Sequence, residues 1–119
     1  MKRESRQGFF VDLEGMIEFA RDGIVSKTVA KKAGSDITLF CMQTGQELST
    51  HSASFPAIIH VLKGKGIITL GNQTYEAKSN AWFYMPKGLP HAVQSTENLV
   101  FLLTLFRKQP KTTLGKSRD

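Results

Sequence analysis

The fold is decided by a stretch near the middle of the chain, Gly45-Gln-Glu-Leu-Ser-Thr-His51-Ser-Ala53-Ser-Phe-Pro-Ala57-Ile-Ile-His60-Val-Leu-Lys-Gly64-Lys-Gly66. Its apolar run from Ala57 to Leu62 predicts a strand that ends at the glycines Gly64 and Gly66. A later stretch, Pro86-Lys-Gly88-Leu-Pro-His91, again combines turn residues with a histidine. The two stretches place His51 in the first half of the chain and His91 in the second.

Other short apolar segments on both sides of this stretch also predict strands. They are residues 24–29, 37–42, 67–70, 74–75, 82–85, 91–94 and 99–106. Turn signals such as Asp22-Gly23 and Gly71-Asn72 separate them, and residues 31–36 are expected to form a loop. A helical period is confined to about residues 14–20. Many short strands with close turn signals indicate an all-β sandwich or barrel.

The two quoted stretches resemble the paired signature of the cupin superfamily. Gly45, His51 and Gly64 fall on the first motif of that family, and Pro86, Gly88 and His91 fall on the second. The resemblance covers roughly residues 33–106. It implies a double-stranded β-helix, or jelly-roll, cupin barrel with an N-terminal strand extension. Gly64, Gly66 and Gly88 are then expected where the chain reverses with positive φ.

The metal-binding set of the family is incomplete in this chain. In the family, two histidines and a glutamate of the first motif and the histidine of the second bind one divalent metal. Here Ala53 stands at the second histidine position and Ala57 at the glutamate position. In the second motif, Asn80 and Ser95 replace the opening glycine and the closing asparagine. Half of the ligand set is therefore missing.

His51 and His91 are the candidate metal ligands that remain. Two imidazoles would make a weak site, because catalytic zinc sites ordinarily have three protein ligands. They would prefer a divalent transition metal to calcium or magnesium. The alternative is a metal-free barrel mouth in which both rings are hydrogen-bonded to each other, to a hydroxyl group or to water. The residues leave this choice open.

Substitute ligands are hard to find in the sequence. His60 lies three residues past Ala57, so in an unbroken strand it faces the opposite side, and only a bulge would turn it inward. Gln43, Glu47 and Tyr84 have no spacing argument in their favour. Each of these is more often a surface or packing residue.

The expected ligand site is an apolar pocket in the barrel interior, with His51 and His91 as its polar anchors. The residues expected to line it are Phe40, Met42, Phe55, Ile59, Val61, Trp82, Tyr84 and Phe101. The alternative for each apolar residue is that it fills the core. The function predicted from this pocket is binding of a small molecule, with or without a weakly held divalent metal.

Two other functions stay open. The resemblance also implies a metal-dependent enzyme of the dioxygenase, isomerase or decarboxylase type, in which a histidine would move protons. A regulatory module acting through the basic tails is the third hypothesis. The net charge of +6 belongs to those tails, because residues 8–106 hold eight bases and eight acids. We expect a basic tail at 1–8, one domain at 9–106 and a flexible basic tail at 107–119. The tails lack interleaved aromatic residues, so no specific nucleic-acid partner is expected.

The remaining features concern the location of the protein and its oligomeric state. No apolar run approaches the roughly 20 residues that cross a bilayer, so no membrane partner is expected. The single cysteine, Cys41, lies in an apolar run and is expected to be a buried, inert thiol, which fits a cytoplasmic location. A homodimer is expected if the strand at residues 23–30 pairs with a partner's sheet; otherwise that strand folds onto its own sheet.

Overall fold

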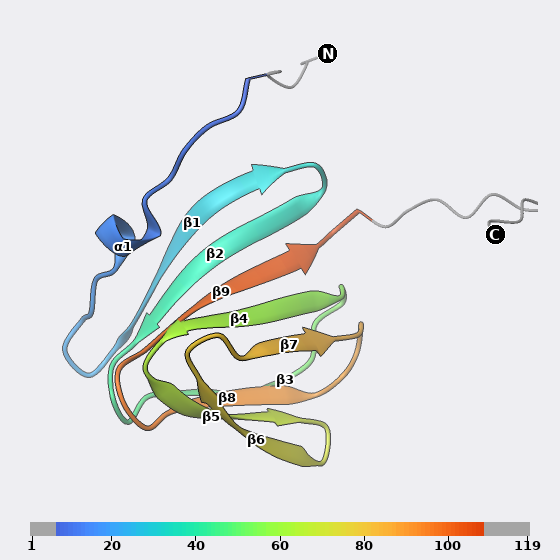
Figure 1. Cartoon of the computed structure of the whole chain (residues 1–119). Helices are drawn as coiled ribbons and strands as arrows, with labels where there is room; N and C mark the ends of the chain where they lie inside the picture. The colour runs from blue at the N-terminus through green and yellow to red at the C-terminus, as the bar shows by residue number, and fades with distance from the viewer. Residues whose placement is uncertain (1–6, 109–119) are drawn as a thin grey trace, which may run out of the picture.

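The computed structural model describes residues 7–108, and in this part of the chain nine strands form two antiparallel sheets (Figure 1). The elements are α1 (Leu13–Met16), β1 (Ile24–Lys32), β2 (Ser35–Met42), β3 (Glu47–His51), β4 (Ala57–Lys63), β5 (Lys65–Leu70), β6 (Gln73–Lys78), β7 (Trp82–Met85), β8 (His91–Ser95) and β9 (Leu99–Phe106). The large sheet has the order β1-β2-β9-β4-β7, and the small sheet has the order β3-β8-β5-β6. The predicted jelly-roll architecture is confirmed, with β1 as the N-terminal extension.

The two sheets enclose the main core. Along β4 the buried residues alternate with partly exposed ones, as a strand with one face on the core requires. The same alternation on β7 buries Phe83 and Met85 and leaves Trp82 and Tyr84 exposed. The buried members of this core are Met42, Ala57, Ile59, Val61, Ile68, Ala77, Phe83, Met85, Val93, Leu99 and Phe101.

A second, smaller apolar cluster lies on the outer face of the large sheet. It consists of Leu39, Cys41 and Val100, and Met16 and Ile17 of the N-terminal segment pack against it. Figure 1 shows this segment running along the outside of β1. The prediction of a buried Cys41 is confirmed, since the segment covers the face on which the thiol lies. The helical period expected over residues 14–20 shrinks to α1, a single turn.

Local predictions at two turns need correction. The expected loop at 31–36 is a tight hairpin turn, because β1 continues to Lys32 and β2 begins at Ser35. Ala33 and Gly34 both have positive φ, as a two-residue hairpin turn prefers. Positive φ is confirmed at Gly64 and Gly88 but not at Gly66. At Gly66 the requirement is space, because a Cβ atom would lie 2.5 Å from the carbonyl oxygen of Gln94 on β8.

The basic tails predicted at 1–8 and 107–119 lie mostly outside the described residues. At the edge of the second one, Arg107 Nε donates a hydrogen bond to Asp36 Oδ2 at 2.8 Å. Between residues 7 and 108, no helix has the length and apolar character needed to cross a membrane.

Candidate functional site

The two histidines singled out in the sequence lie side by side. His51 is the last residue of β3 and His91 the first of β8, and they are directly opposite each other in the register of the small sheet. Their ring centroids are 4.3 Å apart with the planes at 62°. His91 is buried, whereas His51 is exposed. The pair therefore spans the distance from the interior to solvent at one end of the barrel.

Each imidazole is held by a hydrogen bond to the backbone two residues before it. His51 Nδ1 lies 2.8 Å from the carbonyl oxygen of Ser49, and His91 Nδ1 lies 2.9 Å from that of Leu89. A carbonyl oxygen only accepts, so Nδ1 carries the proton and donates in both rings. In the neutral form, the lone pair of each ring is then on Nε2. The backbone therefore selects the same tautomer, with the proton on Nδ1, in both histidines.

Both rings line a small cavity between the sheets. Its volume is about 110 Å³, and it is lined by Phe40, Leu48, His51, Ile59, His91, Val93, Phe101 and Leu103. Phe40 and Phe101 stack nearly parallel on its wall, with centroids 5.0 Å apart. Every lining residue apart from the two histidines is apolar. The imidazoles are therefore the side chains that can offer hydrogen bonds to a molecule in this cavity.

Five of the residues expected to line a pocket do line it, and five do not. His51, His91, Phe40, Ile59 and Phe101 line the cavity. Met42 and Val61 are fully buried in the core but do not line the cavity, and Phe55 is half-buried in the loop before β4. Trp82 and Tyr84 are 58% and 50% exposed, because the alternation along β7 turns them to the outer face.

Sequence reasoning missed three lining residues. Val93 and Leu103 lie two residues beyond His91 and Phe101, so the period of a strand could have found them. Leu48 could not be found in this way, because it lies three residues before His51. A register shift between Leu48 and His51 puts both side chains on the cavity.

The donor set in the cavity suits a metal only in part. The two Nε2 atoms are available, and an Nδ1–H donated to a carbonyl is the arrangement that orients metal-binding histidines. Ala57, at the glutamate position of the motif, is buried and offers only a methyl group. In residues 7–108, no three side chains of histidine, cysteine, aspartate or glutamate come together as a metal cluster. A metal here would have two protein ligands, one fewer than a catalytic zinc site ordinarily has.

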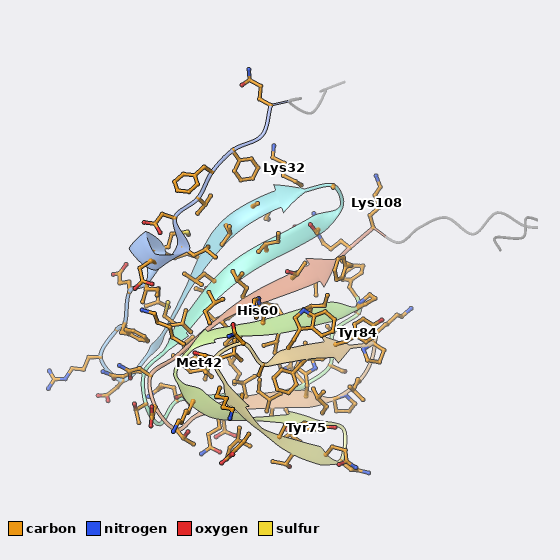
Figure 2. All side chains as sticks on the ribbon, in the orientation of Figure 1. Lys32, Met42, His60, Tyr75, Tyr84 and Lys108 are labelled. Atoms are coloured by element: carbon orange, nitrogen blue, oxygen red, sulfur yellow. The ribbon has the colours of Figure 1, made fainter. Side chains whose placement is uncertain are left out.

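The substitute ligands considered from the sequence all lie elsewhere. His60 faces the outside of the large sheet, two residues before Leu62, which packs on the outer cluster (Figure 2). Gln43 accepts a hydrogen bond from the backbone N–H of Asp22 through its Oε1. Glu47 and Tyr84 are exposed, and neither they nor Gln43 line the cavity.

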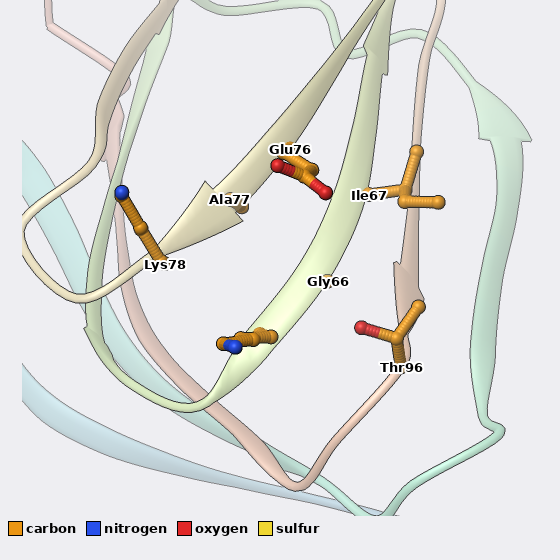
Figure 3. A pocket seen from close by; sticks show the side chains of 7 residues that line it. Gly66, Ile67, Glu76, Ala77, Lys78 and Thr96 are labelled. Atoms are coloured by element: carbon orange, nitrogen blue, oxygen red, sulfur yellow. The ribbon is translucent and has the colours of Figure 1, made fainter.

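A second hollow, of about 200 Å³, lies on the outer side of the small sheet (Figure 3). It is lined by Lys65, Gly66, Ile67, Glu76, Ala77, Lys78 and Thr96. Lys65 and Lys78 are opposite each other in the register, and the Nζ atom of Lys65 lies 4.0 Å from Glu97 Oε2. The charged side chains at this hollow are exposed, which is ordinary for the solvent face of a sheet. The cavity with the two histidines is the better candidate site.

Comparison with known proteins identifies the class. The family model described as "Cupin domain" matches residues 38–105, and this chain belongs to that family. A solved structure of a conserved protein of unknown function from Streptococcus pyogenes is 28% identical, with a TM-score of 0.76 over 88% of this chain and 92% of that one. A cupin 2 conserved barrel domain protein from Leptotrichia buccalis is 30% identical, with a TM-score of 0.72 over 78% of this chain and 45% of that one.

An enzyme with the same fold is a more distant match. Salicylate 1,2-dioxygenase from Pseudoaminobacter salicylatoxidans, solved as adducts with gentisate, is 14% identical, with a TM-score of 0.67. The match covers 78% of this chain and 27% of the dioxygenase. At this identity the likeness concerns the fold alone. No curated protein matches the chain.

Proposed function

We propose that this cupin domain binds a small, largely apolar molecule in the cavity between its sheets, with His51 and His91 as the polar anchors. The observation that carries the proposal is the pairing of two oriented imidazoles with a wall that is otherwise apolar. A ligand pocket typically combines apolar walls with a few convergent polar groups. A cavity of about 110 Å³ suits a molecule of one small ring.

The test is a fragment screen by amide NMR on the full chain. We expect small apolar fragments to shift the signals of residues around the cavity, with dissociation constants on the order of millimolar. Leu48→Trp, which fills the cavity, should abolish these shifts, whereas His60→Ala on the outer face should leave them unchanged. Unfolding curves of both variants check that each is folded. Fragments that bind elsewhere, or that bind the Leu48→Trp variant equally well, contradict the proposal.

The second candidate is a metal-dependent cupin enzyme, and the orientation of the two Nδ1–H groups favours it. His51 and His91 would hold a divalent transition metal through Nε2, and the metal would supply Lewis-acid chemistry at its open positions. Because only two protein ligands are present, we expect weak binding. Elemental analysis of untagged protein purified without added metal should find well under one equivalent per chain. A full equivalent that is lost in His51→Ala/His91→Ala would favour the enzyme.

We also propose that two copies of the chain associate as a homodimer. β1 pairs with β2 of its own chain and forms an edge of the large sheet. An edge strand offers unpaired backbone groups, and two-fold pairing of β1 with a second β1 would satisfy them. Light scattering should then give twice the chain mass of 13.2 kDa. A mass of one chain at every concentration tested contradicts the dimer.

A further inference from the structure

We infer that the molecule bound in this cavity presents a hydrogen-bond donor, as an alcohol or a phenol does, to an Nε2 atom of the histidine pair. The inference rests on the proposed function and names the chemical class of its ligand. Its basis is the balance of donors and acceptors on the cavity wall.

The two Nδ1 protons are already used. His51 donates one to the Ser49 carbonyl oxygen and His91 the other to that of Leu89, at 2.8 and 2.9 Å. A neutral imidazole has a single N–H, so each Nε2 can only accept. The other lining side chains are hydrocarbon. The neutral cavity therefore offers two side-chain acceptors and no side-chain donor.

A ligand must complement these acceptors. A hydroxyl group donates a hydrogen bond to a lone pair on Nε2. A carboxylate or a ketone brings only further lone pairs, so it leaves the imidazole unsatisfied and loses its own hydration. An unpaired polar group in a buried site reduces affinity by roughly tenfold or more. A hydrocarbon of the same shape loses the hydrogen bond to Nε2 as well.

The size and shape of the cavity limit the rest of the ligand. Its volume of about 110 Å³ is somewhat below the roughly 150 Å³ of an apolar cavity that holds benzene. The exposed side chain of His51 marks the side that is open to solvent. The nearly parallel rings of Phe40 and Phe101 form one wall. A single ring fits only if part of it extends through this open side, with its hydroxyl group at the histidines.

The experiment compares three probes of similar size, phenol, toluene and benzoate, on the chelator-dialysed full chain at pH 8. Amide NMR titration gives the dissociation constants and the site. At pH 8 we expect phenol to bind at least about tenfold more tightly than toluene or benzoate. His51→Ala should remove most of the preference for phenol, and His60→Ala should retain it.

The outcomes separate the two proposals. Equal binding of phenol and toluene in the cavity, or tighter binding of benzoate at pH 8, overturns the donor inference while the binding site stands. Binding of none of the three probes at the cavity contradicts the proposed function itself. Because His91 is buried and its replacement can unfold the chain, the result with the exposed His51 decides the matter.

Discussion

Gly64 lies directly against the backbone of Asn98, so closely that a Cβ atom at Gly64 would be 1.7 Å from the Asn98 carbonyl oxygen. Its φ of 86° is also in the left-handed region. Gly64 connects β4 of the large sheet to β5 of the small sheet, and Asn98 immediately precedes β9. This contact therefore fixes how the chain crosses between the two sheets that form the cavity.

Replacing Gly64 with alanine should destabilise the fold strongly. A side chain at positive φ costs about 1–2 kcal/mol, and the clash with backbone adds to it, so we expect a total of at least about 3 kcal/mol. Gly45→Ala is the matched control, because Gly45 has a φ of 88° but no atom within 4 Å of the new Cβ. It should cost only about 1–2 kcal/mol. Equal free energies of unfolding for the two variants would show that the contact does not matter.

A second prediction concerns Ser95, which stands where the family motif has an asparagine. Ser95 is buried, and its Oγ donates to the carbonyl oxygen of Gln43 at 2.6 Å and accepts from the N–H of Gln46 at 2.9 Å. Ser95→Ala should therefore lower the free energy of unfolding by about 1–3 kcal/mol. Ser79→Ala removes one exposed hydrogen bond, to Leu62, and should cost less than about 1 kcal/mol. Denaturant unfolding measures both, and a neutral Ser95→Ala would refute a structural role.

The ion pair between Glu18 and Lys27 predicts a pH effect. Lys27 Nζ lies 2.8 Å from Glu18 Oε1, and the hydrogen bond and then the charge of Lys27 lower the pKa of Glu18 below 4.5. A lowered carboxyl pKa stabilises the folded state at pH values above 4.5, and this stabilisation is lost as the pH falls through the folded-state pKa. The effect should be small, since the pair is exposed to solvent.

An NMR titration of Glu18 checks this linkage. Lys27→Met should raise the Glu18 pKa toward 4.5, whereas Lys31→Met, at an exposed position farther along β1, should not. If Lys27→Met leaves the Glu18 pKa where it was, the ion pair is absent in solution.

The proximity of His51 and His91 could be predicted although they are 40 residues apart, because each belongs to one of the two paired motifs. Which apolar residues line the cavity could be predicted only in part. The large sheet is covered on both faces, by the small sheet on one side and by the N-terminal segment on the other. Both of its faces therefore carry apolar residues. Leu39 and Cys41 therefore belong to the outer cluster and Phe40 and Met42 face the main core, although all four are apolar. A pattern of hydrophobic residues cannot assign a face in such a strand.

The same limit explains the error at Trp82 and Tyr84. Their aromatic character suggested an interior position, but Phe83 and Met85 are apolar too and occupy it. Leu48 shows the other limit, because a register shift is a property of the paired strands β3 and β8. The register shift can be recognised only once the pairing of the two strands is known.

The last prediction uses Cys41 to test the N-terminal cover. Its thiol is fully buried under the outer cluster, to which Met16 and Ile17 contribute. A thiol reagent should react with folded protein at least about a hundredfold more slowly than with unfolded protein, because reaction requires a local opening. Ile17→Asp should speed the reaction by weakening the packing of the segment, while Phe10→Ser, at a side chain that is 87% exposed, should leave the rate unchanged. Rapid labelling of the folded wild-type chain would mean that the segment does not protect the large sheet in solution.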